Sequence, residues 1–262
     1  MNIKIDHLSG RCEGSLRITG SKSETNRLLL LQALFKGFQL ENISNSDDSK
    51  VMQEALKSTS EVVDVHHAGT AMRFLTAYFS HLEGSEVLLT GSTRMQERPI
   101  KILVDALRSI GASIVYDKVE GFPPIRIKGK KLLGGTISLP ADISSQYISA
   151  LLLLGPVLEK GLKLNLVGKI TSMPYIKMTL ALLNNLGINT SFKDQLIWVG
   201  SVNKIKRINQ VVESDWSSAS YFFSIVALAK KAEISLTSFK KLSLQGDVIL
   251  LDIYKQLGVS AR

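Results

Sequence analysis

The sequence predicts an α/β protein in which a strand–helix–strand–helix unit is repeated. Helical segments of one design recur: each opens with small or hydroxyl-bearing residues, becomes strongly apolar and ends near a charged residue. A short strand-like segment follows each of them, and a second helical segment follows each strand. In three units, the residue that ends the apolar helix is a glycine or an alanine, and it lies about 26 residues before the glycine that ends the amphipathic helix. This constant spacing supports a true repeat. The four apolar segments are residues 21–37, 68–84, 144–161 and 217–232.

The second helix of each unit is amphipathic, with apolar residues at i, i+3, i+4 and i+7, and a weaker copy lies at 48–59. A helix that is apolar all round must be buried, whereas an amphipathic helix lies at the outside of a core. We therefore expect helices inside and sheets around them. The strands are expected at 38–43, 85–91, 162–168 and 233–238, and the clear amphipathic helices at 98–112, 174–188 and 245–259.

Two segments are predicted to form strand pairs, and each pair completes a unit. Residues 112–129 contain two β-rich runs around a Gly-Phe-Pro-Pro turn, and residues 188–201 form the corresponding pair in the next unit. The first unit has no such pair, because residues 58–70 lead almost directly into the next helix. We expect a tolerated surface deletion there.

Composition narrows the class of protein. The 262 residues are 45% hydrophobic and 21% charged, as in a globular chain with one large or two medium domains. Cys12 is the single cysteine, so an internal disulfide is excluded, and the four histidines show no metal-ligand spacing. We expect no metal and no organic cofactor. The N-terminus lacks a signal-peptide core and the apolar runs are too short for a membrane span, so we expect a cytoplasmic protein.

The net charge of +9 admits nucleic acid, an anionic surface or small anions as partners. Much of the excess lies at 126–135 and 202–209, which read as solvated hairpin and linker lysines. No aromatic-rich basic strand of the RNA-binding type is present in the sequence. We therefore expect small anionic molecules as partners, and neither nucleic acid nor membrane.

Basic and hydroxyl-bearing residues stand at the start of the apolar helices. In the segment 20–34, Lys22, Ser23 and Arg27 precede a run of leucines. A helix N-terminus has unpaired N–H groups and a positive dipole, so it attracts anions, although basic residues normally avoid that end. Either an ordinary solvated helix start or an anion site fits this stretch taken alone.

Similar groups open the other helices, and a repeat can bring equivalent ends to one face. A glycine at such a place lets a ligand approach the backbone closely. Two arginines, a lysine and several hydroxyls suit a ligand with more than one phosphate or carboxylate. The further groups are Gly69, Thr70, Arg73, Arg94, Arg98, Ser144, Ser145, Gln146, Ser172 and Tyr175.

These motifs, in this order, resemble the 3-phosphoshikimate 1-carboxyvinyltransferase (EPSP synthase) family over essentially the whole chain. The resemblance implies an inside-out α/β prism of two domains built from βαβαββ units. It also implies transfer of the enolpyruvyl group of phosphoenolpyruvate to the 5-hydroxyl of shikimate 3-phosphate in aromatic amino acid biosynthesis, without metal or cofactor. The motifs are "GSKSETNR", "AGTAMR", "RMQERPI", "SSQY", "SMPY", "SDWSSASYF" and "LQGD".

The resemblance also implies a role for each motif residue. Lys22 would contact both substrates. Ser23 and Arg27 would bind shikimate 3-phosphate, with Arg27 at its carboxylate, and Tyr175 would line the ring site. The phosphate of that substrate would be held by Ser144, Ser145 and Ser172, and phosphoenolpyruvate would be contacted by Gly69, Arg98 and Gln146.

The chain departs from the family in length, since members exceed four hundred residues. We expect residues 15–213 to form the shikimate-3-phosphate domain, and residues 1–14 with 214–262 to form part of a second, incomplete domain. The segment that supplies the family's catalytic carboxylate would be absent, so we expect this polypeptide alone to be inactive. Apolar surface such as "YFFSIVALA" would lack part of its cover. The full-length protein would be a monomer.

Two other interpretations stay open. One is UDP-N-acetylglucosamine enolpyruvyl transferase, which has the same architecture but usually carries a reactive cysteine on a mobile loop, whereas Cys12 falls in the first strand segment. The other is a noncatalytic module that holds an anionic metabolite. A smaller departure is His67, where many members have asparagine, and we expect it to cap the following helix.

Overall fold

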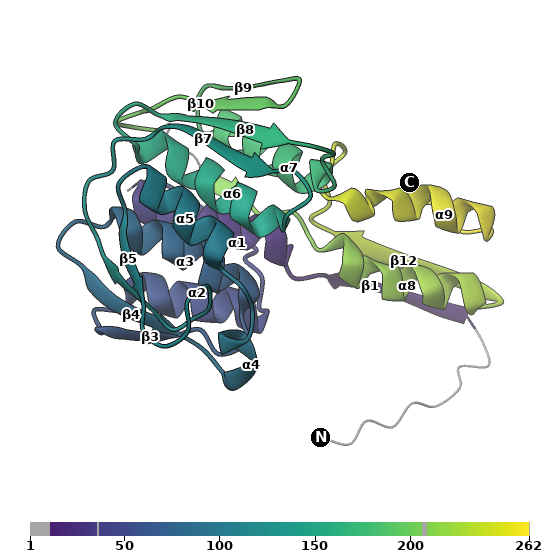
Figure 1. Ribbon diagram of the computed structural model, residues 1–262. Coiled ribbons are helices and arrows are strands. Elements are labelled where there is room, and N and C mark those ends of the chain that lie inside the picture. Colours follow the sequence, from purple (N-terminus) through teal and green to yellow (C-terminus); the bar gives the residue numbers. More distant parts are fainter. Residues whose placement is uncertain (1–10, 36, 206–208, 262) are drawn as a thin grey trace.

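The computed structural model describes residues 11–35, 37–205 and 209–261, and it has two lobes joined by two chain segments (Figure 1). The larger lobe runs from α1 to β11, and the smaller lobe contains β1, α8, β12 and α9. The helices are α1 (Lys22–Leu34), α2 (Asp47–Lys57), α3 (Gly69–His81), α4 (Thr93–Gln96), α5 (Lys101–Ser109), α6 (Ser145–Leu154), α7 (Met173–Asn185), α8 (Trp216–Leu228) and α9 (Leu250–Gln256), with 3-10 turns η1 (Gly155–Val157) and η2 (Gly246–Ile249). The strands are β1 (Arg11–Arg17), β2 (Gln39–Glu41), β3 (Val62–Asp64), β4 (Glu86–Thr90), β5 (Ser113–Tyr116), β6 (Ile125–Lys128), β7 (Gly135–Pro140), β8 (Leu162–Val167), β9 (Thr190–Lys193), β10 (Leu196–Val199), β11 (Asn209–Val211) and β12 (Lys231–Thr237).

Two sheets of the larger lobe have the same topology, which confirms the predicted repeat. Their strand orders are β3-β4-β6-β5 and β7-β8-β10-β9. In each, the first two strands are parallel and the last two form an antiparallel hairpin beside the second. The chain passes through strand, buried helix, strand, outer helix and hairpin in both cases, so the unit is βαβαββ.

The first unit differs because it has no hairpin after α2, as predicted. Its strand β2 pairs in parallel with β11, which lies at the other end of the lobe's sequence. The pairing of Glu41 with Val211 therefore closes the larger lobe by joining its first strand to its last.

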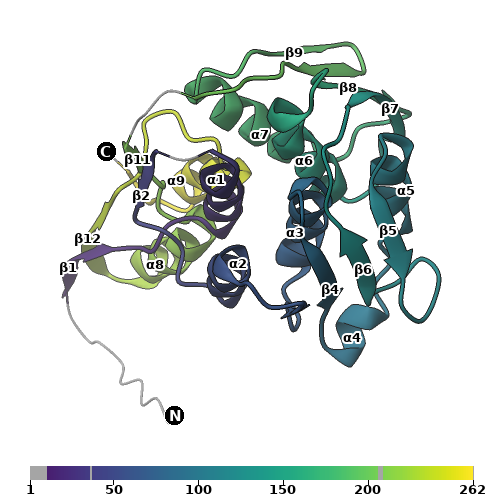
Figure 2. The same ribbon diagram turned by 90° about the vertical axis from the view of Figure 1, so that its left-hand side faces the viewer.

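Three helices fill the inside of the larger lobe, and the sheets surround them (Figure 2). Helix α3 is buried from Gly69 to Ser80, and α1 and α6 each bury eight consecutive residues. Helix α5, by contrast, buries only one face, formed by Leu103, Val104, Ala106 and Leu107. The expected inside-out arrangement, with apolar helices within and amphipathic helices between the sheets, is confirmed.

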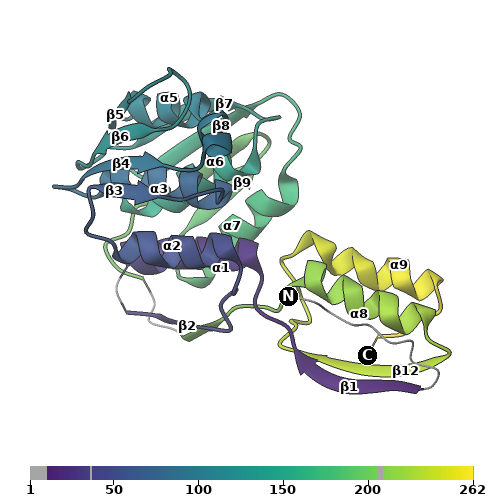
Figure 3. The ribbon, with the colours of Figure 1, turned by 90° about the horizontal axis from the view of Figure 1, so that it is seen from below.

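The smaller lobe is thinly packed. Strands β1 and β12 pair in parallel, and α8 and α9 lie over one face of that two-stranded sheet (Figure 3). Among the described residues, its buried apolar cluster consists of Ile18, Trp216 and Ala219, whereas Leu228 of α8 is 88% exposed. The apolar segment at α8 thus lacks part of its cover, as the sequence suggested. Strand β1 extends to Arg17, so the smaller lobe reaches three residues beyond the predicted boundary at 14; residues 1–10 lie outside the described ranges.

The two segments that join the lobes pair with each other. Residues 18–21 and 212–215, here called the crossing segments, meet at an antiparallel bridge between Gly20 and Ser214. The Ser21 N–H donates to the carbonyl of Glu213 at 2.8 Å, and the Asp215 N–H donates to the carbonyl of Thr19 at 3.0 Å. A Cβ atom at residue 20 would overlap the backbone carbonyl oxygen of Asn42, which directly follows β2. Only glycine therefore fits where the two crossing segments meet.

The difference in packing predicts a difference in local stability. Amides of β1, β12 and α8 should exchange with deuterium by local opening well before those of α1, α3 and α6, because few buried apolar contacts hold the smaller lobe. Hydrogen-exchange mass spectrometry of the chain would measure this. Equal protection of the two lobes would contradict the account of the packing.

Candidate anion-binding site

Arg27 is the point where four helices of the larger lobe meet. Its guanidinium is 3% exposed and donates to the backbone carbonyl of Ser23 at 2.8 Å. It also donates to the hydroxyl of Ser149 on α6 at 2.7 Å and to that of Thr179 on α7 at 2.8 Å. The ring of Tyr175 lies 5.6 Å from its charge, and a ring of α3 lies on another side. One cation therefore holds together the N-terminal halves of α1, α6 and α7.

A second set of contacts lies at the start of α3. The side-chain amide of Gln146 donates to the hydroxyl of Thr70 at 3.2 Å, which links the first turns of α6 and α3. The guanidinium of Arg98 lies directly over Gly69, since a Cβ atom at residue 69 would come within 2.5 Å of its Nη1. Glycine here lets the cation approach the backbone closely, and a Cβ atom would displace the end of the Arg98 side chain. Gly69, Arg98 and Gln146 form one end of the site.

Three serines stand beside these helix ends. Ser144 is the N-cap residue of α6, and its hydroxyl accepts the N–H of Gln146 at 3.4 Å. Ser145 follows it as the first residue of α6, and Ser172 precedes α7 and contacts the carbonyl of Ile143 at 3.5 Å. The starts of α6 and α7 are therefore neighbours.

Lys22 is the first residue of α1 and is exposed, and Ser23 is half-buried. The structure thus brings the ten sequence-predicted residues to the N-terminal ends of α1, α3, α6 and α7 and to the segment before α5. Two of them make hydrogen bonds between these helices, since Arg27 binds hydroxyls of α6 and α7 and Gln146 binds a hydroxyl of α3. We call this set the anion wall: Lys22, Ser23, Arg27, Gly69, Arg98, Ser144, Ser145, Gln146, Ser172 and Tyr175.

Helix capping differs among the helices that carry the anion wall, since the Ser144 side chain caps α6 by accepting a backbone N–H. Ser46, Ser92 and Asp215 cap α2, α4 and α8 by accepting a backbone N–H of the first turn. No side chain caps α1, α3 or α7, although Ser21 and Ser172 occupy two of the N-cap positions. Where first-turn amides lack a side-chain cap, as in α1 and α3, the helix dipole favours an anion. In α7, by contrast, Pro174 has no N–H, and the Tyr175 N–H donates to the carbonyl of Ser172 at 3.1 Å.

The charges of the wall are not neutralised from within. Burial lowers the pKa of Arg27 to about 10, with the Tyr175 hydroxyl opposing the shift, so the guanidinium stays charged at neutral pH. Burial also lowers the pKa of Arg73, whose guanidinium donates to the carbonyls of Gly69 and Pro99 and lies over Tyr147. Both cations have neutral oxygen partners. Buried cations without a carboxylate are costly, which indicates that this region is organised around an external anion.

Two supporting residues were not predicted. Ser149 and Thr179 bind the Arg27 guanidinium from inside α6 and α7. Their signal in the sequence is a hydroxyl placed within an otherwise apolar helical run, where it needs a buried polar partner. Without the packing of three helices, that partner cannot be identified.

The expectation for His67 is wrong. Ala68 is the N-cap residue of α3, and no side chain caps that helix. The Nδ1 atom of His67 instead lies 2.9 Å from Nδ1 of His66, whose backbone is held in a left-handed turn by the carboxylate of Asp64. The turn directs His67 toward its neighbour and away from the helix amides. Arg94, also considered in the sequence, is exposed on α4.

The arrangement indicates what the wall can bind. It offers cations, hydroxyls and free helix amides at two linked ends, which suits a small organic molecule with more than one anionic group. Among the described residues, no three His, Cys, Asp or Glu side chains gather as a metal site would require. In the same ranges, none of the helices is both long and apolar enough to cross a bilayer.

The fold and the candidate site together define a class: an inside-out α/β protein of repeated βαβαββ units with basic and hydroxyl-bearing residues at the N-terminal ends of its inner helices. The model of the family described as EPSP synthase (3-phosphoshikimate 1-carboxyvinyltransferase) matches residues 57–262. The chain belongs to this family.

Known relatives support the assignment of the chain to this family. A 3-phosphoshikimate 1-carboxyvinyltransferase of Bacteroides fragilis (strain YCH46) is 48% identical over 250 residues, which cover 95% of this chain and 60% of the relative. One of Actinobacillus pleuropneumoniae serotype 5b (strain L20) is 38% identical over 280 residues, covering 95% and 64%. A solved EPSP synthase structure from Acinetobacter baumannii has the same fold, with a TM-score of 0.78 at 22% identity over 94% of this chain and 60% of that one. The chain thus spans about three fifths of the length of these relatives.

Because the hydrogen-bond partners of Arg27 are neutral, replacing this residue tests whether its charge serves the fold or a ligand. Arg27→Met should leave the melting temperature unchanged or raise it by roughly 2–8 °C, because a costly buried charge is replaced by an apolar side chain. The hydroxyl of Thr179 keeps its bond to the Tyr175 carbonyl. Thermal unfolding measured by circular dichroism tests this.

Arg108→Met is the matched control. Arg108 is half-exposed, binds the Ile114 carbonyl through two nitrogens and lies over Tyr116, so its loss should lower the melting temperature. A fall for Arg27→Met as large as that of the control would mean that Arg27 is a structural anchor and not a charge held for a ligand.

Proposed function

We propose that this chain binds shikimate 3-phosphate on the anion wall, as the part of an EPSP synthase that holds this substrate. The enzyme joins the enolpyruvyl group of phosphoenolpyruvate to the 5-hydroxyl of shikimate 3-phosphate and releases phosphate. Membership of the family supports the proposal. The observation that carries it is the buried guanidinium of Arg27 at the meeting point of α1, α6 and α7, with only neutral partners.

The two ends of the wall suit the two substrates. At one end, Arg27 with Ser23 and Tyr175 would receive the carboxylate and ring of shikimate 3-phosphate. The serines beside the start of α6 and α7 would bind its phosphate, since hydroxyls and free helix amides are good phosphate donors. These serines are Ser144, Ser145 and Ser172.

At the other end, Gly69, Arg98 and Gln146 would contact phosphoenolpyruvate. The close packing of the Arg98 guanidinium on Gly69 would place a cation beside the first amides of α3, which favours a carboxylate or phosphate. Lys22 lies on the first turn of α1 and would contact both substrates. An exposed ammonium with three rotatable donors is suited to such a shared contact.

The reaction requires a group that takes the proton of the 5-hydroxyl and one that protonates C3 of phosphoenolpyruvate. In the described part of the wall, the side chains are cationic, hydroxylic or amidic, and the carboxylate of α1's first turn points to the smaller lobe. We therefore propose that residues 1–262 alone bind shikimate 3-phosphate without turning it over. The whole enzyme's activity would need acidic groups supplied from elsewhere.

Titration calorimetry of the chain with shikimate 3-phosphate tests the proposal. Lys22→Ala should weaken binding by about 10- to 100-fold, the effect of one charge-assisted hydrogen bond. Lys193→Ala, at an exposed lysine on β9, is the matched control and should bind as the parent does. No binding by the parent would refute the assignment.

The same titration separates the alternatives. Binding of UDP-N-acetylglucosamine in place of shikimate 3-phosphate would assign the chain to the sister transferase reaction. Strong oligonucleotide binding that falls steeply with salt would indicate a nucleic-acid partner. Turnover of both substrates by these residues alone would contradict the proposal that binding and chemistry are separable here.

A further inference from the structure

An ion pair joins the two lobes beside the anion wall. Glu24, in the first turn of α1, is 0% exposed, and its Oε1 lies 2.7 Å from Nζ of Lys240. Lys240 belongs to the smaller lobe, in the loop that follows β12, and its side chain is partly exposed. The pair therefore links the helix turn that carries Lys22 and Ser23 to a different lobe of the protein.

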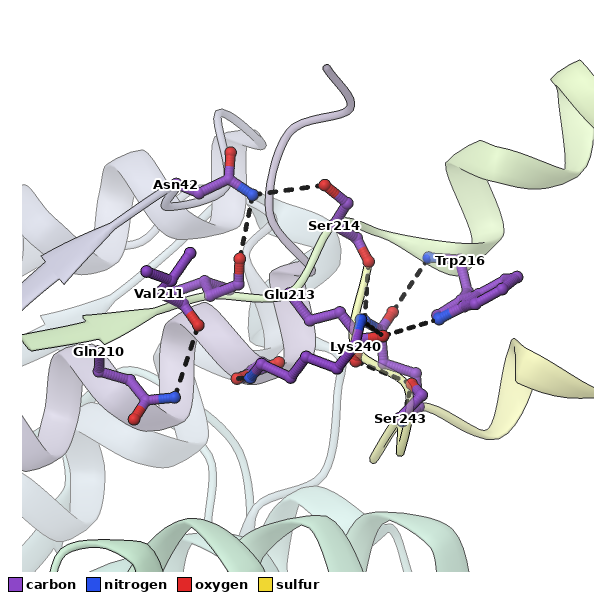
Figure 4. Close-up of polar contacts among 11 residues, drawn as sticks. Asn42, Gln210, Val211, Glu213, Ser214, Trp216, Lys240 and Ser243 are labelled. Atoms are coloured by element: carbon purple, nitrogen blue, oxygen red, sulfur yellow. Dashed lines mark hydrogen bonds and ion pairs between the residues drawn. The ribbon is translucent and has the colours of Figure 1, made fainter. Parts of the chain in front are cut away.

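The loop that carries Lys240 is held in place by Glu213 of the second crossing segment (Figure 4). One oxygen of the Glu213 carboxylate accepts the indole N–H of Trp216 at 2.9 Å and the backbone N–H of Lys240 at 3.1 Å. The other oxygen accepts the hydroxyl of Ser243 at 2.8 Å. With its backbone fixed in this way, Lys240 projects toward α1 from a defined position.

The same turn of α1 is anchored separately to the larger lobe. The backbone N–H of Ser44 donates to the hydroxyl of Thr25 at 2.9 Å, and the hydroxyl of Ser49 donates to the side-chain oxygen of Asn26 at 2.8 Å. Glu24 is the residue of this turn that carries a contact to the smaller lobe. A shift of that lobe about the crossing segments would therefore reach α1 through Glu24.

We propose that Glu24 and Lys240 are positioning residues, which couple the orientation of the smaller lobe to the N-terminal turn of α1 and thus to Lys22. The coupling of the lobes is a property of the chain itself. Its consequence for ligand binding rests on the proposed function, because only there does Lys22 have a ligand to contact.

The energetics favour coupling over stability as the role of this pair. Burial raises the pKa of Glu24, the nearby Lys240 ammonium lowers it, and the Glu213 carboxylate raises it further; these are the charged groups that face it. Its second oxygen, Oε2, has no hydrogen-bond partner. A buried ion pair of this kind contributes little net stability, although loss of one partner can be costly.

The sign of the pH effect follows from the raised pKa. The folded chain holds the Glu24 proton to a higher pH than the unfolded chain does, so ionisation of Glu24 costs stability as the pH rises through that window. Falling pH neutralises Glu24 and removes its attraction to Lys240, and protonation of this one group does not itself destabilise the fold. Glu24→Gln imitates this neutral state at every pH.

Stability measurements give the first test. Glu24→Gln should keep the parent's melting temperature or raise it, whereas Lys240→Met leaves a buried carboxylate unpaired and should lower it by roughly 5 °C. The double variant should recover most of that loss. Lys241→Met, at the exposed neighbouring lysine, is the control and should match the parent. Equal losses for Glu24→Gln and Lys240→Met, without recovery in the double variant, would overturn the proposal.

Lobe orientation gives the second test, and it needs no ligand. The lone Cys12 lies on β1 of the smaller lobe, and Glu54→Cys adds an exposed cysteine on α2 of the larger lobe. Spin labels at both sites report the distance between the lobes. We expect a narrow distance distribution for the parent and for Lys241→Met at neutral pH, and a broader one for Glu24→Gln at any pH and for the parent in acid. Equal widths for the parent and Glu24→Gln at neutral pH would overturn the proposal. If the parent chain does not bind shikimate 3-phosphate, the proposed function is wrong, whereas the result on lobe coupling still stands.

Discussion

One buried positive charge organises the site: the guanidinium of Arg27, which three helices share and no carboxylate neutralises. It stays in place because hydroxyls of Ser149 and Thr179 and two aromatic rings surround it. A charge held in this way costs free energy that a purely structural contact would not require. The uncapped ends of α1, α3 and α7 add to the same positive field. We propose that an anion completes this arrangement in the interior of the larger lobe.

The inside-out fold makes this arrangement possible. In most α/β proteins helices cover the faces of a sheet, whereas here the sheets surround α1, α3 and α6 (Figure 2). Because the repeated units place equivalent helices side by side, their N-termini reach the same end of the lobe. The first turn of α1 carries Lys22 and Ser23, which we propose as substrate contacts, and Glu24, which binds Lys240 of the smaller lobe. The proposed substrate contact and the contact between the lobes thus lie within three consecutive residues.

Sequence periodicity predicts the repeat, the buried and outer helices, and both hairpins, because each depends on local spacing of apolar residues. It does not reveal β3, β7 or β11, or the pairing of β2 with β11, which joins distant parts of the chain. Basic, hydroxyl-bearing and small residues at helix starts indicate a candidate anion site, and the ten wall residues are those that the family resemblance selects from them. Ser149, Thr179 and the Glu24–Lys240 pair do not, because their partners are set by packing across helices and lobes. The prediction that His67 caps α3 is wrong for a local reason, since the left-handed turn at His66 brings His67 against His66.

The central claim is that the charge of Arg27 is held for a ligand carboxylate. Side-chain NMR of the ¹⁵N-labelled chain, with the Arg27 Nε–H resonance assigned by its loss in Arg27→Met, measures this directly during titration with shikimate 3-phosphate. We expect the Arg27 resonance to shift in step with occupancy, and we expect an analogue of shikimate 3-phosphate whose carboxylate is replaced by a neutral amide to leave that resonance unchanged. A chain that binds shikimate 3-phosphate while the Arg27 resonance stays unchanged would contradict it.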